Sequence, residues 1–445
     1  MPIIKNKIVK YVFIVSLAGF LFGFDTVVIS GVNLPIKNLW QTSEWFHGTF
    51  IISMSLWGTV IGALLGGYPT EKLGRKVTLI WVGMMFIVSA LGASLASGPY
   101  FFSVFRFIGG LSAGVASIAA PTYISEISKA QNRGSLVMLF QFNIVFGILM
   151  AYLSNYILVG VSGVNDWRLM LGVEVVPALL FSLFVWNIPK SPRWLITHEK
   201  NITEARKILR LTTSENDVNN LIEALRKEPD RHRSNESGLF SGKYNRILLL
   251  SFLIAFFNQF SGISFILFYA PEILEKAGFG TTDSLLSSFF IGFVNLIFTL
   301  AGIYLIDSVG RKQLMYIGSV GYIISLSMLA YGFYVSSPPI FQLIFLLLFI
   351  TSHAVGQGAV IWVFISEIFP TKIRSFGQAW GSGILNVFAA LIALFGSVLI
   401  NAFAPWMVFT LFASFMVLQL MFTHFMMPET KGISLEELEN KLLQT

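Results

Sequence analysis

The chain has 445 residues, of which 55% are hydrophobic and only 12% are charged. Because a soluble domain carries about 25% charged residues, this composition excludes an ordinary water-soluble protein and predicts that lipid covers part of the surface. The net charge of +7 does not indicate a nucleic-acid partner, since the basic residues lie in short segments between apolar runs. The absence of cysteine excludes disulfides and thiolate metal sites.

Apolar stretches of about twenty residues, long enough to cross a bilayer, recur along the whole chain. The first follows three lysines, as a signal peptide would, but it is too long for a signal-peptide core and lacks a small-residue cleavage site. We therefore interpret it as a retained helix. The pattern predicts an all-α integral membrane protein with twelve transmembrane helices, at about 10–32, 48–69, 77–96, 100–124, 136–158, 168–188, 246–270, 285–306, 313–334, 340–365, 376–399 and 404–426.

The distribution of basic residues predicts the orientation of these helices. Of the 30 Lys and Arg residues, Lys37, Arg168 and Lys276 fall at the outer ends of spans and Arg106 falls inside a helix, which leaves 30 − 4 = 26 on the side of the N-terminus. The positive-inside rule then predicts a multi-pass protein of the plasma (inner) membrane with both termini in the cytoplasm.

One long polar segment divides the spans into two groups of six. It contains a helix-start pattern, the capping box Asn201-Ile-Thr-Glu204, and the C-terminal tail contains another, Ser434-Leu-Glu-Glu437. We therefore predict an N-terminal half at 1–189, a cytoplasmic linker with short helices at 190–244, a C-terminal half at 245–427 and a cytoplasmic tail at 428–445.

Charged motifs recur at nearly constant spacing in the two halves. An acid followed by Gly-Arg-Lys comes after spans two and eight, and Ser-Glu followed by an arginine comes after spans four and ten. The offsets are 311 − 75 = 236, 367 − 126 = 241 and 374 − 133 = 241. This repeat predicts two homologous halves, as in alternating-access carriers. We expect the acids and arginines to pair across the halves and to close the cytoplasmic side: Glu71, Arg75, Glu126, Arg133, Asp307, Arg311, Glu367 and Arg374.

Three ionisable residues fall inside the predicted spans, namely Asp25, Arg106 and Glu174. Charges inside a membrane are costly, so their presence indicates a function. The predicted topology places all three in the outer half of the bilayer, where they can meet. Two carboxylates and one guanidinium sum to −1, which makes one carboxylate a candidate to carry a proton. The alternative is a structural ion pair beside an acid that faces water.

The combination of motifs resembles the sugar porter family of the major facilitator superfamily, over nearly the whole chain. The resemblance rests on the two Gly-Arg-Lys turns and on three further segments, Gly23-Phe-Asp25-Thr-Val-Val-Ile-Ser-Gly31, Pro189-Lys-Ser-Pro-Arg193-Trp-Leu195 and Pro428-Glu-Thr-Lys-Gly432. It implies twelve helices in two six-helix halves. It also implies that Asp25 is the proton carrier, because proton-coupled members have an acid at the matching position.

A sugar site needs amide side chains and an aromatic platform. Gln141, the adjacent Asn258 and Gln259, and Trp362 supply them at mid-membrane depth, although a lone intramembrane glutamine can also join two helices. The resemblance implies sugar contacts for Gln141, Gln259 and Trp362, and also for two further positions, Phe22 and Gly358. Departures from the family pattern at Asn258, Ser264 and Asn386 leave the particular sugar open, and the roles of His353 and Gln357 stay unassigned.

We therefore predict a carrier that couples proton entry to the uptake of a monosaccharide or related polyol and that works as a monomer without a cofactor. A facilitative uniporter of the same fold is the main alternative, and a non-transporting nutrient sensor is a second. The chain lacks the HExxH, GxSxG and Walker sequences, which argues against an enzyme or an ATP-driven pump.

Overall fold

The computed structural model describes residues 2–128, 133–211, 218–219, 222–223, 239–240, 242–370, 373–433, 437–439 and 442. The described residues form helices and contain no strand. Eleven helices are long and apolar enough to cross a membrane, and a bent pair, Glu44–Ile52 with Met54–Leu65, supplies a twelfth span. Each of the twelve predicted spans overlaps one of them, so the predicted all-α membrane fold is confirmed.

The helices follow one another with short connections. The first six spans contain α1 (Pro2–Trp40), α2 (Glu44–Phe46), the π-helical turn His47–Ile52, α3 (Met54–Leu65), α4 (Gly67–Lys72), α5 (Arg75–Ser94), α6 (Pro99–Ile127), α7 (Arg133–Leu158), α8 (Asp166–Gly172) and α9 (Val175–Trp186). The polar segment contains α10 (Pro192–Trp194) and α11 (Ile202–Leu209). The last six spans contain α13 (Asn245–Phe260), α14 (Ile263–Lys276), α15 (Thr281–Val309), α16 (Arg311–Tyr334), α17 (Pro339–Val355), α18 (Gln357–Ile368), α19 (Arg374–Ala402) and α20 (Pro405–Phe425).

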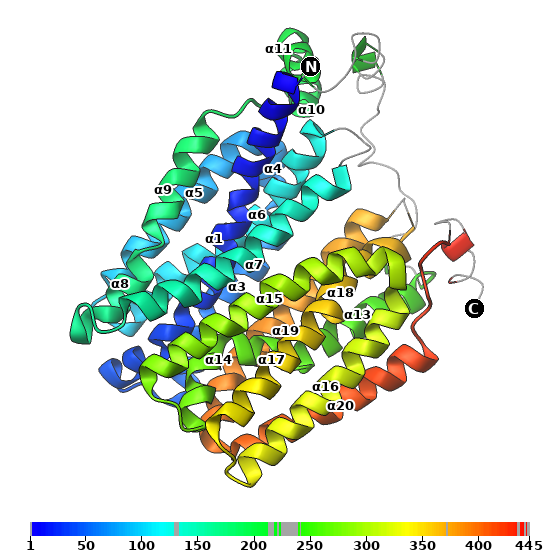
Figure 1. The fold of residues 1–445 in the computed structure, drawn as a ribbon. Helices are drawn as coiled ribbons and strands as arrows, with labels where there is room; N and C mark the ends of the chain where they lie inside the picture. Colours follow the sequence, from blue (N-terminus) through cyan, green and yellow to red (C-terminus); the bar gives the residue numbers. More distant parts are fainter. Residues whose placement is uncertain are drawn as a thin grey trace.

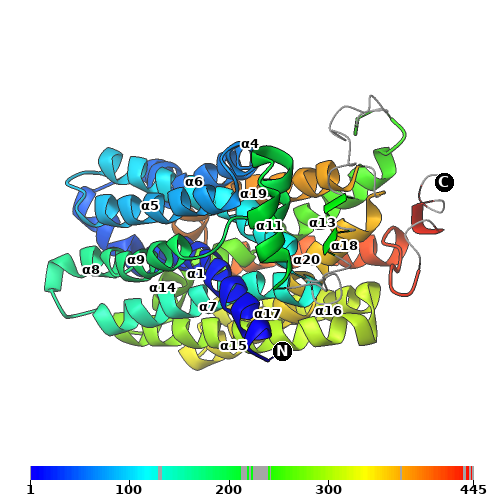
Figure 2. The same cartoon turned by 90° about the horizontal axis from the view of Figure 1, so that it is seen from above.

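Both chain ends lie at one end of the helix bundle, together with α4, α10 and α11 (Figure 1). We call this the terminal end, and we call the opposite end, which carries α8, the distal end. Figure 1 shows the helices of the first six spans as one group and those of the last six as another, and the two groups diverge toward the terminal end. In the view from above, α5, α6, α7, α15 and α16 run along a common direction (Figure 2).

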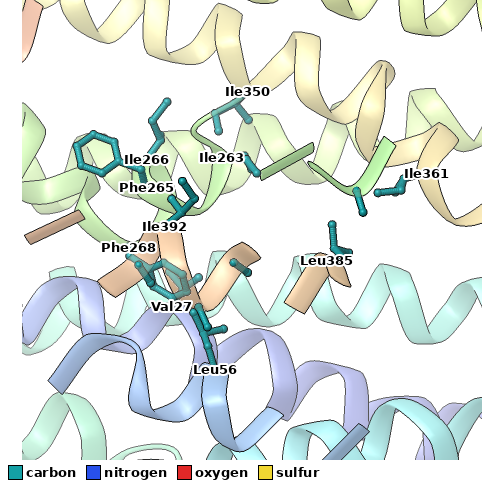
Figure 3. Close-up of a cluster of buried hydrophobic side chains, with 14 of the residues drawn as sticks. Val27, Leu56, Ile263, Phe265, Ile266, Phe268, Ile350, Ile361, Leu385 and Ile392 are labelled. Atoms are coloured by element: carbon teal, nitrogen blue, oxygen red, sulfur yellow. The ribbon is translucent and has the colours of Figure 1, made fainter. Parts of the chain in front are cut away.

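The distal ends of the two groups meet through an apolar layer. Val27 of α1 and Leu56 of α3 belong to the same buried cluster as Phe268 of α14 and Ile392 of α19. Figure 3 shows these four side chains close together between the helices. Close packing of apolar side chains excludes water, so this layer closes the distal end.

Two spans in the last six are interrupted near mid-length. Gly262 has φ +90°, a left-handed conformation that ends α13 and starts α14, and other residues adopt it at a cost. The break between α17 and α18 lies at Gly356, which packs against Gly318 of α16 so closely that a Cβ on Gly356 would lie 2.8 Å from the Gly318 Cα. Both breaks free backbone and side-chain polar groups in the interior of the bundle.

The predicted helix start in the polar segment is confirmed. The Asn201 Oδ1 accepts a hydrogen bond from the Glu204 backbone N–H at 3.1 Å, and the Asn201 Nδ2 donates to the Glu204 carboxylate at 3.2 Å. The second predicted box begins at Ser434, which lies outside the described residues.

Candidate transport site

A buried ion pair joins α1 to α6. The Arg106 Nη1 donates to the Asp25 Oδ1 at 2.5 Å, and the Arg106 Nη2 donates to the Asp25 carbonyl oxygen at 2.8 Å. The Ser55 hydroxyl donates to the other carboxylate oxygen of Asp25 at 2.8 Å. Gly109 permits this approach, because a Cβ at its position would lie 2.9 Å from the Asp25 Oδ1. Both charged side chains are at most 2% exposed, so each compensates the other's loss of hydration.

Glu174, the third predicted member, lies where α8 gives way to α9 and is close enough to interact electrostatically with Asp25 and Arg106. It is 2% exposed, and its Oε1 has no hydrogen-bond partner among the described residues. The structure therefore brings the three predicted residues together. Two carboxyl groups thus share one guanidinium in a buried site, which makes one of them a candidate to hold a proton.

A cluster of amides lies around the break between α13 and α14. The Ser264 hydroxyl donates to the Gln259 Oε1 at 2.5 Å, and the Gln259 Nε2 donates to the Asn258 Oδ1 at 3.0 Å. The Asn258 Nδ2 in turn donates to the Gln357 Oε1 at 3.1 Å. Three predicted sugar ligands therefore lie in one hydrogen-bonded cluster. Gln357, to which the sequence assigned no role, starts α18 at the Gly356 break and belongs to the same cluster.

The other predicted ligands lie on helices from both groups, namely Phe22 on α1, Gln141 on α7, Gly358 and Trp362 on α18, and Asn386 on α19. Gln141 and Asn386 are partly exposed and make no side-chain hydrogen bond with the described residues. Trp362 is 41% exposed. Their polar groups are thus free to bind a ligand. His353, the other residue without an assigned role, bonds instead to the Tyr322 hydroxyl through its Nδ1 at 2.5 Å.

At the terminal end, Arg75 joins α4, α5 and α6 in the first group. Its Nη2 lies 2.9 Å from the Glu126 Oε1 and 2.9 Å from the Glu71 Oε2, and its Nη1 donates to the Thr70 carbonyl at 3.2 Å. The Ser191 hydroxyl donates to the other Glu126 oxygen at 2.5 Å. We call this set of contacts the first arginine cluster.

A matching set, the second arginine cluster, surrounds Arg311. Its Nη2 lies 2.8 Å from the Glu367 Oε1 and 3.2 Å from the Asp307 Oδ1, and its Nη1 donates to the Ile306 carbonyl at 3.1 Å. The Thr430 hydroxyl takes the place of Ser191 and donates to the Glu367 Oε2 at 2.5 Å. The spacing 430 − 191 = 239 extends the sequence repeat to the hydroxyl groups.

Each arginine cluster joins helices of a single group, the first cluster in the first six spans and the second cluster in the last six. The expected pairing of these acids and arginines across the two groups is therefore not observed among the described residues, because the terminal ends diverge and each arginine finds its acids on neighbouring helices of its own group. The Arg374 Nε donates to the Phe369 carbonyl at 3.3 Å. The Arg133 side chain lies outside the described part of the chain.

Among the described residues, the hydrogen bonds that cross between the groups lie toward the distal end. The Asn33 Nδ2 donates to the Glu272 Oε2 at 3.0 Å, and its Oδ1 contacts the His47 Nε2 at 2.5 Å. Glu44 accepts from Ser397 at 2.8 Å and from Asn401 at 3.0 Å. One further bond, at 2.7 Å, joins the Tyr152 hydroxyl to the Leu267 carbonyl.

Glu272 and His47 correct the prediction that Asp25, Arg106 and Glu174 are the ionisable residues inside the spans. Glu272 is 5% and His47 is 1% exposed. The seventh span does not end at residue 270, because the helix continues through Pro271 to Lys276. The second span likewise begins earlier than predicted, at Glu44.

Comparison with known proteins agrees with this geometry. The family model described as "Sugar (and other) transporter" matches residues 11–442. The chain is 32% identical to the D-xylose-proton symporter of Escherichia coli, over 98% of this chain and 96% of that protein. It is 33% identical to the glucose transporter GlcP of Staphylococcus epidermidis, over 96% of this chain and 95% of that protein.

A solved structure of the inward open conformation of the xylose transporter XylE from E. coli superposes with a TM-score of 0.84 at 31% identity, over 98% of this chain and 99% of that one. The comparison therefore identifies a multi-pass membrane transporter and not an enzyme. The chain belongs to the sugar porter family of the major facilitator superfamily.

Proposed function

We propose that the protein is a secondary active carrier that couples the movement of a proton to that of a monosaccharide or related polyol. Asp25 carries the proton, Arg106 controls its release, and Glu174 is the third member of the cluster. The observation that carries the proposal is the buried cluster itself, in which the Glu174 carboxyl group lies beside the Asp25–Arg106 ion pair, so that two carboxyl groups share one guanidinium. Two carboxylates and one guanidinium sum to −1, and a buried site is more stable without net charge, so the cluster favours one bound proton.

The two halves of the chain, 1–189 and 245–427, rotate against each other around the amide cluster, with 190–244 as the cytoplasmic linker and 428–445 as the tail. In this proposal the terminal end faces the cytoplasm, and the two arginine clusters form the cytoplasmic gate. They hold the helix ends of each half in place while the gate is open. Sugar hydroxyls bind to the amide side chains, and Trp362 supplies an apolar face to the sugar ring.

The proton carrier is tested with Asp25→Asn in purified protein reconstituted into liposomes. The amide keeps an acceptor for Arg106 but binds no proton at neutral pH, so we expect loss of accumulation driven by a pH gradient and retention of counterflow. Asp283→Asn, at an exposed carboxylate in the first turn of α15, is the control and should accumulate substrate normally. Accumulation by Asp25→Asn would overturn the assignment.

The substrate class is tested by counterflow with labelled pentoses, hexoses, inositol and other polyols, with and without an imposed pH gradient. Uptake that a protonophore does not reduce would favour a facilitative uniporter of the same fold. The absence of counterflow with every compound would overturn the proposed function.

A further inference from the structure

The amide cluster at the α13–α14 break continues away from the candidate sugar site, into the wall of the last six spans. Gln357 bonds not only to Asn258 but also to α20, because its Nε2 donates to the Gln419 Oε1 at 2.6 Å. The Gln419 Nε2 donates to the Ser319 hydroxyl of α16 at 2.8 Å, and that hydroxyl donates to the Met315 carbonyl at 2.7 Å. We call the whole series the amide chain: Ser264, Gln259, Asn258, Gln357, Gln419 and Ser319.

The three members of the amide chain that lie farthest from the candidate sugar site cannot contact a substrate themselves. Gln357, Gln419 and Ser319 are all 0% exposed, whereas Ser264, Gln259 and Asn258 are 8%, 6% and 5% exposed. Polar side chains buried this completely are stable only when they are hydrogen-bonded. Their effect on a ligand must therefore pass through Asn258 and Gln259.

The amide chain has one direction. Each amide donates through its nitrogen toward Ser319 and accepts through its oxygen from the side of Ser264. No single amide can turn over by itself, because that would place two nitrogens or two oxygens against each other. The donors and acceptors are thus linked, and the orientation at the sugar site depends on the bond that Ser319 makes at the far end.

We propose that the amide chain fixes the hydrogen-bond polarity of the sugar site, and that Gln357, Gln419 and Ser319 are positioning residues for substrate specificity. The inference rests on the proposed function. Because the Ser264 hydrogen is used on Gln259, Ser264 presents only acceptor lone pairs to a ligand, whereas Gln259 keeps a second N–H to donate. The preferred substrate is a neutral polyhydroxylated ring with one hydroxyl that donates to Ser264 and another that accepts from Gln259.

The matched test compares Ser319→Ala with Ser325→Ala. Both serines lie on α16, both are 0% exposed, and each hydroxyl donates at 2.7 Å to the backbone carbonyl four residues earlier. Among the described residues, Ser319 alone of the two accepts a bond from an amide. Any general effect of removing a buried hydroxyl from this helix is therefore common to both variants.

The assay is counterflow in liposomes with labelled D-glucose and D-xylose, competed by their monofluoro and monodeoxy derivatives. Fluorine accepts but does not donate a hydrogen bond, and a deoxy position does neither. At the ring position that meets Ser264, we expect wild-type protein to disfavour the fluoro and deoxy derivatives equally. Ser319→Ala removes the bond that fixes the direction of the amide chain, so the Ser264 hydroxyl is no longer restricted to accepting from a ligand and can donate to it. We therefore expect the fluoro derivative, which accepts a hydrogen bond, to bind better than the deoxy derivative at that position.

We also expect Ser319→Ala to raise KM about 2- to 10-fold, the value of one neutral hydrogen bond, with the maximal rate within about 2-fold of wild type. Ser319→Thr keeps the hydroxyl and should restore both properties. An unchanged KM and unchanged fluoro-to-deoxy ratio in Ser319→Ala, or equal effects of Ser325→Ala, would overturn the inference alone. Wild-type protein that gives no counterflow with any sugar would overturn the proposed function and the inference with it.

Discussion

The replacement of Asn33 by leucine should open the distal end of the bundle. The Asn33 amide joins the two groups of helices, since it donates to Glu272 of α14 and also contacts His47 of the bent second span. All three side chains are at most 5% exposed. Leucine is of similar size but leaves the Glu272 oxygen and the His47 nitrogen without these partners, so that both gain by reaching water.

The size of the effect follows from the kind of bond. Leaving a buried polar group without its hydrogen-bond partner costs about 1–3 kcal/mol. The Asn33–Glu272 bond exists only while the distal ends are in contact, so its loss favours the distal-open state by the same amount. At 1.4 kcal/mol for each factor of ten, the ratio of distal-open to distal-closed molecules should rise about 5- to 150-fold.

The absence of native cysteine allows spin labels to report this change directly. Cysteines introduced at Val164, which is 88% exposed between α7 and α8, and at the exposed Thr282 of α15 place one label on each group of helices at the distal end. Double electron–electron resonance then measures the distance distribution between the labels. Asn33→Leu should shift the distribution toward longer distances.

Asn143→Leu is the matched control. Asn143 is 2% exposed, as is Asn33, but it bonds to Ser16 and to the Leu139 carbonyl within its own group of helices. It should leave the distance distribution as in the unsubstituted protein. The same distribution in Asn33→Leu and Asn143→Leu would refute the role of the Asn33–Glu272 bond in distal closure.

Three other substitutions test the helix ends and the broken helix. Arg311→Lys cannot reproduce the two bonds to Glu367 and the bond to Ile306, so it should destabilise the fold by about 1–3 kcal/mol and lower the midpoint of thermal unfolding by several degrees in a size-exclusion thermal-shift assay. Lys312→Arg is the control, because the partly exposed Lys312 side chain donates to the His424 carbonyl and arginine can do the same, so the midpoint should not change. Burial alone would raise the pKa of Glu429, but hydrogen bonds from the backbone N–H groups of Lys431, Arg311, Lys312 and Thr430 outweigh it and lower the pKa. A lowered folded-state pKa stabilises the fold above the ordinary carboxyl pKa, and this stability is lost as the pH falls through the folded-state pKa. The midpoint of thermal unfolding, measured from pH 7 to pH 3, should therefore fall more steeply in wild type than in Glu429→Gln. Parallel curves for the two proteins would contradict the argument. Gly262→Ala should destabilise the fold by about 1–2 kcal/mol through left-handed backbone strain, and it places a Cβ 2.8 Å from the Phe412 ring, so the yield of folded protein should fall. Gly383→Ala on α19 is the control and should be tolerated, because its Cβ meets nothing within 4 Å.

The helices and the intramembrane charge cluster could be predicted from the sequence because both depend on the cost of polar groups in lipid. That cost makes the apolar runs visible, and it makes Asp25 and Arg106 conspicuous inside them. The repeat spacing predicted which acids and arginines belong together, but it predicted pairing across the halves, whereas among the described residues Arg75 and Arg311 bind acids of their own half. The helix that each residue lies on was thus available from the sequence, whereas the relative position of the two groups was not.

The missed residues share a different property. Glu272 follows Pro271, which suggests a helix end, yet the helix continues for five residues beyond it. Gln357 and Gln419 are 62 positions apart, and each is an isolated amide in an apolar run. Whether Gln357, Gln419 and Ser319 meet depends on how α16, α18 and α20 are rotated about their own axes. Hydropathy contains no information on that rotation.

The unequal distribution of bonds between the two ends gives the carrier a preferred resting side. The described hydrogen bonds between the groups lie toward the distal end, while the arginine clusters at the terminal end hold each group separately. A sugar derivative with a bulky substituent can therefore enter from the terminal side, yet it cannot be enclosed by the approach of the terminal ends. Such a compound would inhibit only from that side of the membrane, and sided inhibition in oriented vesicles would report the resting state without any label on the protein.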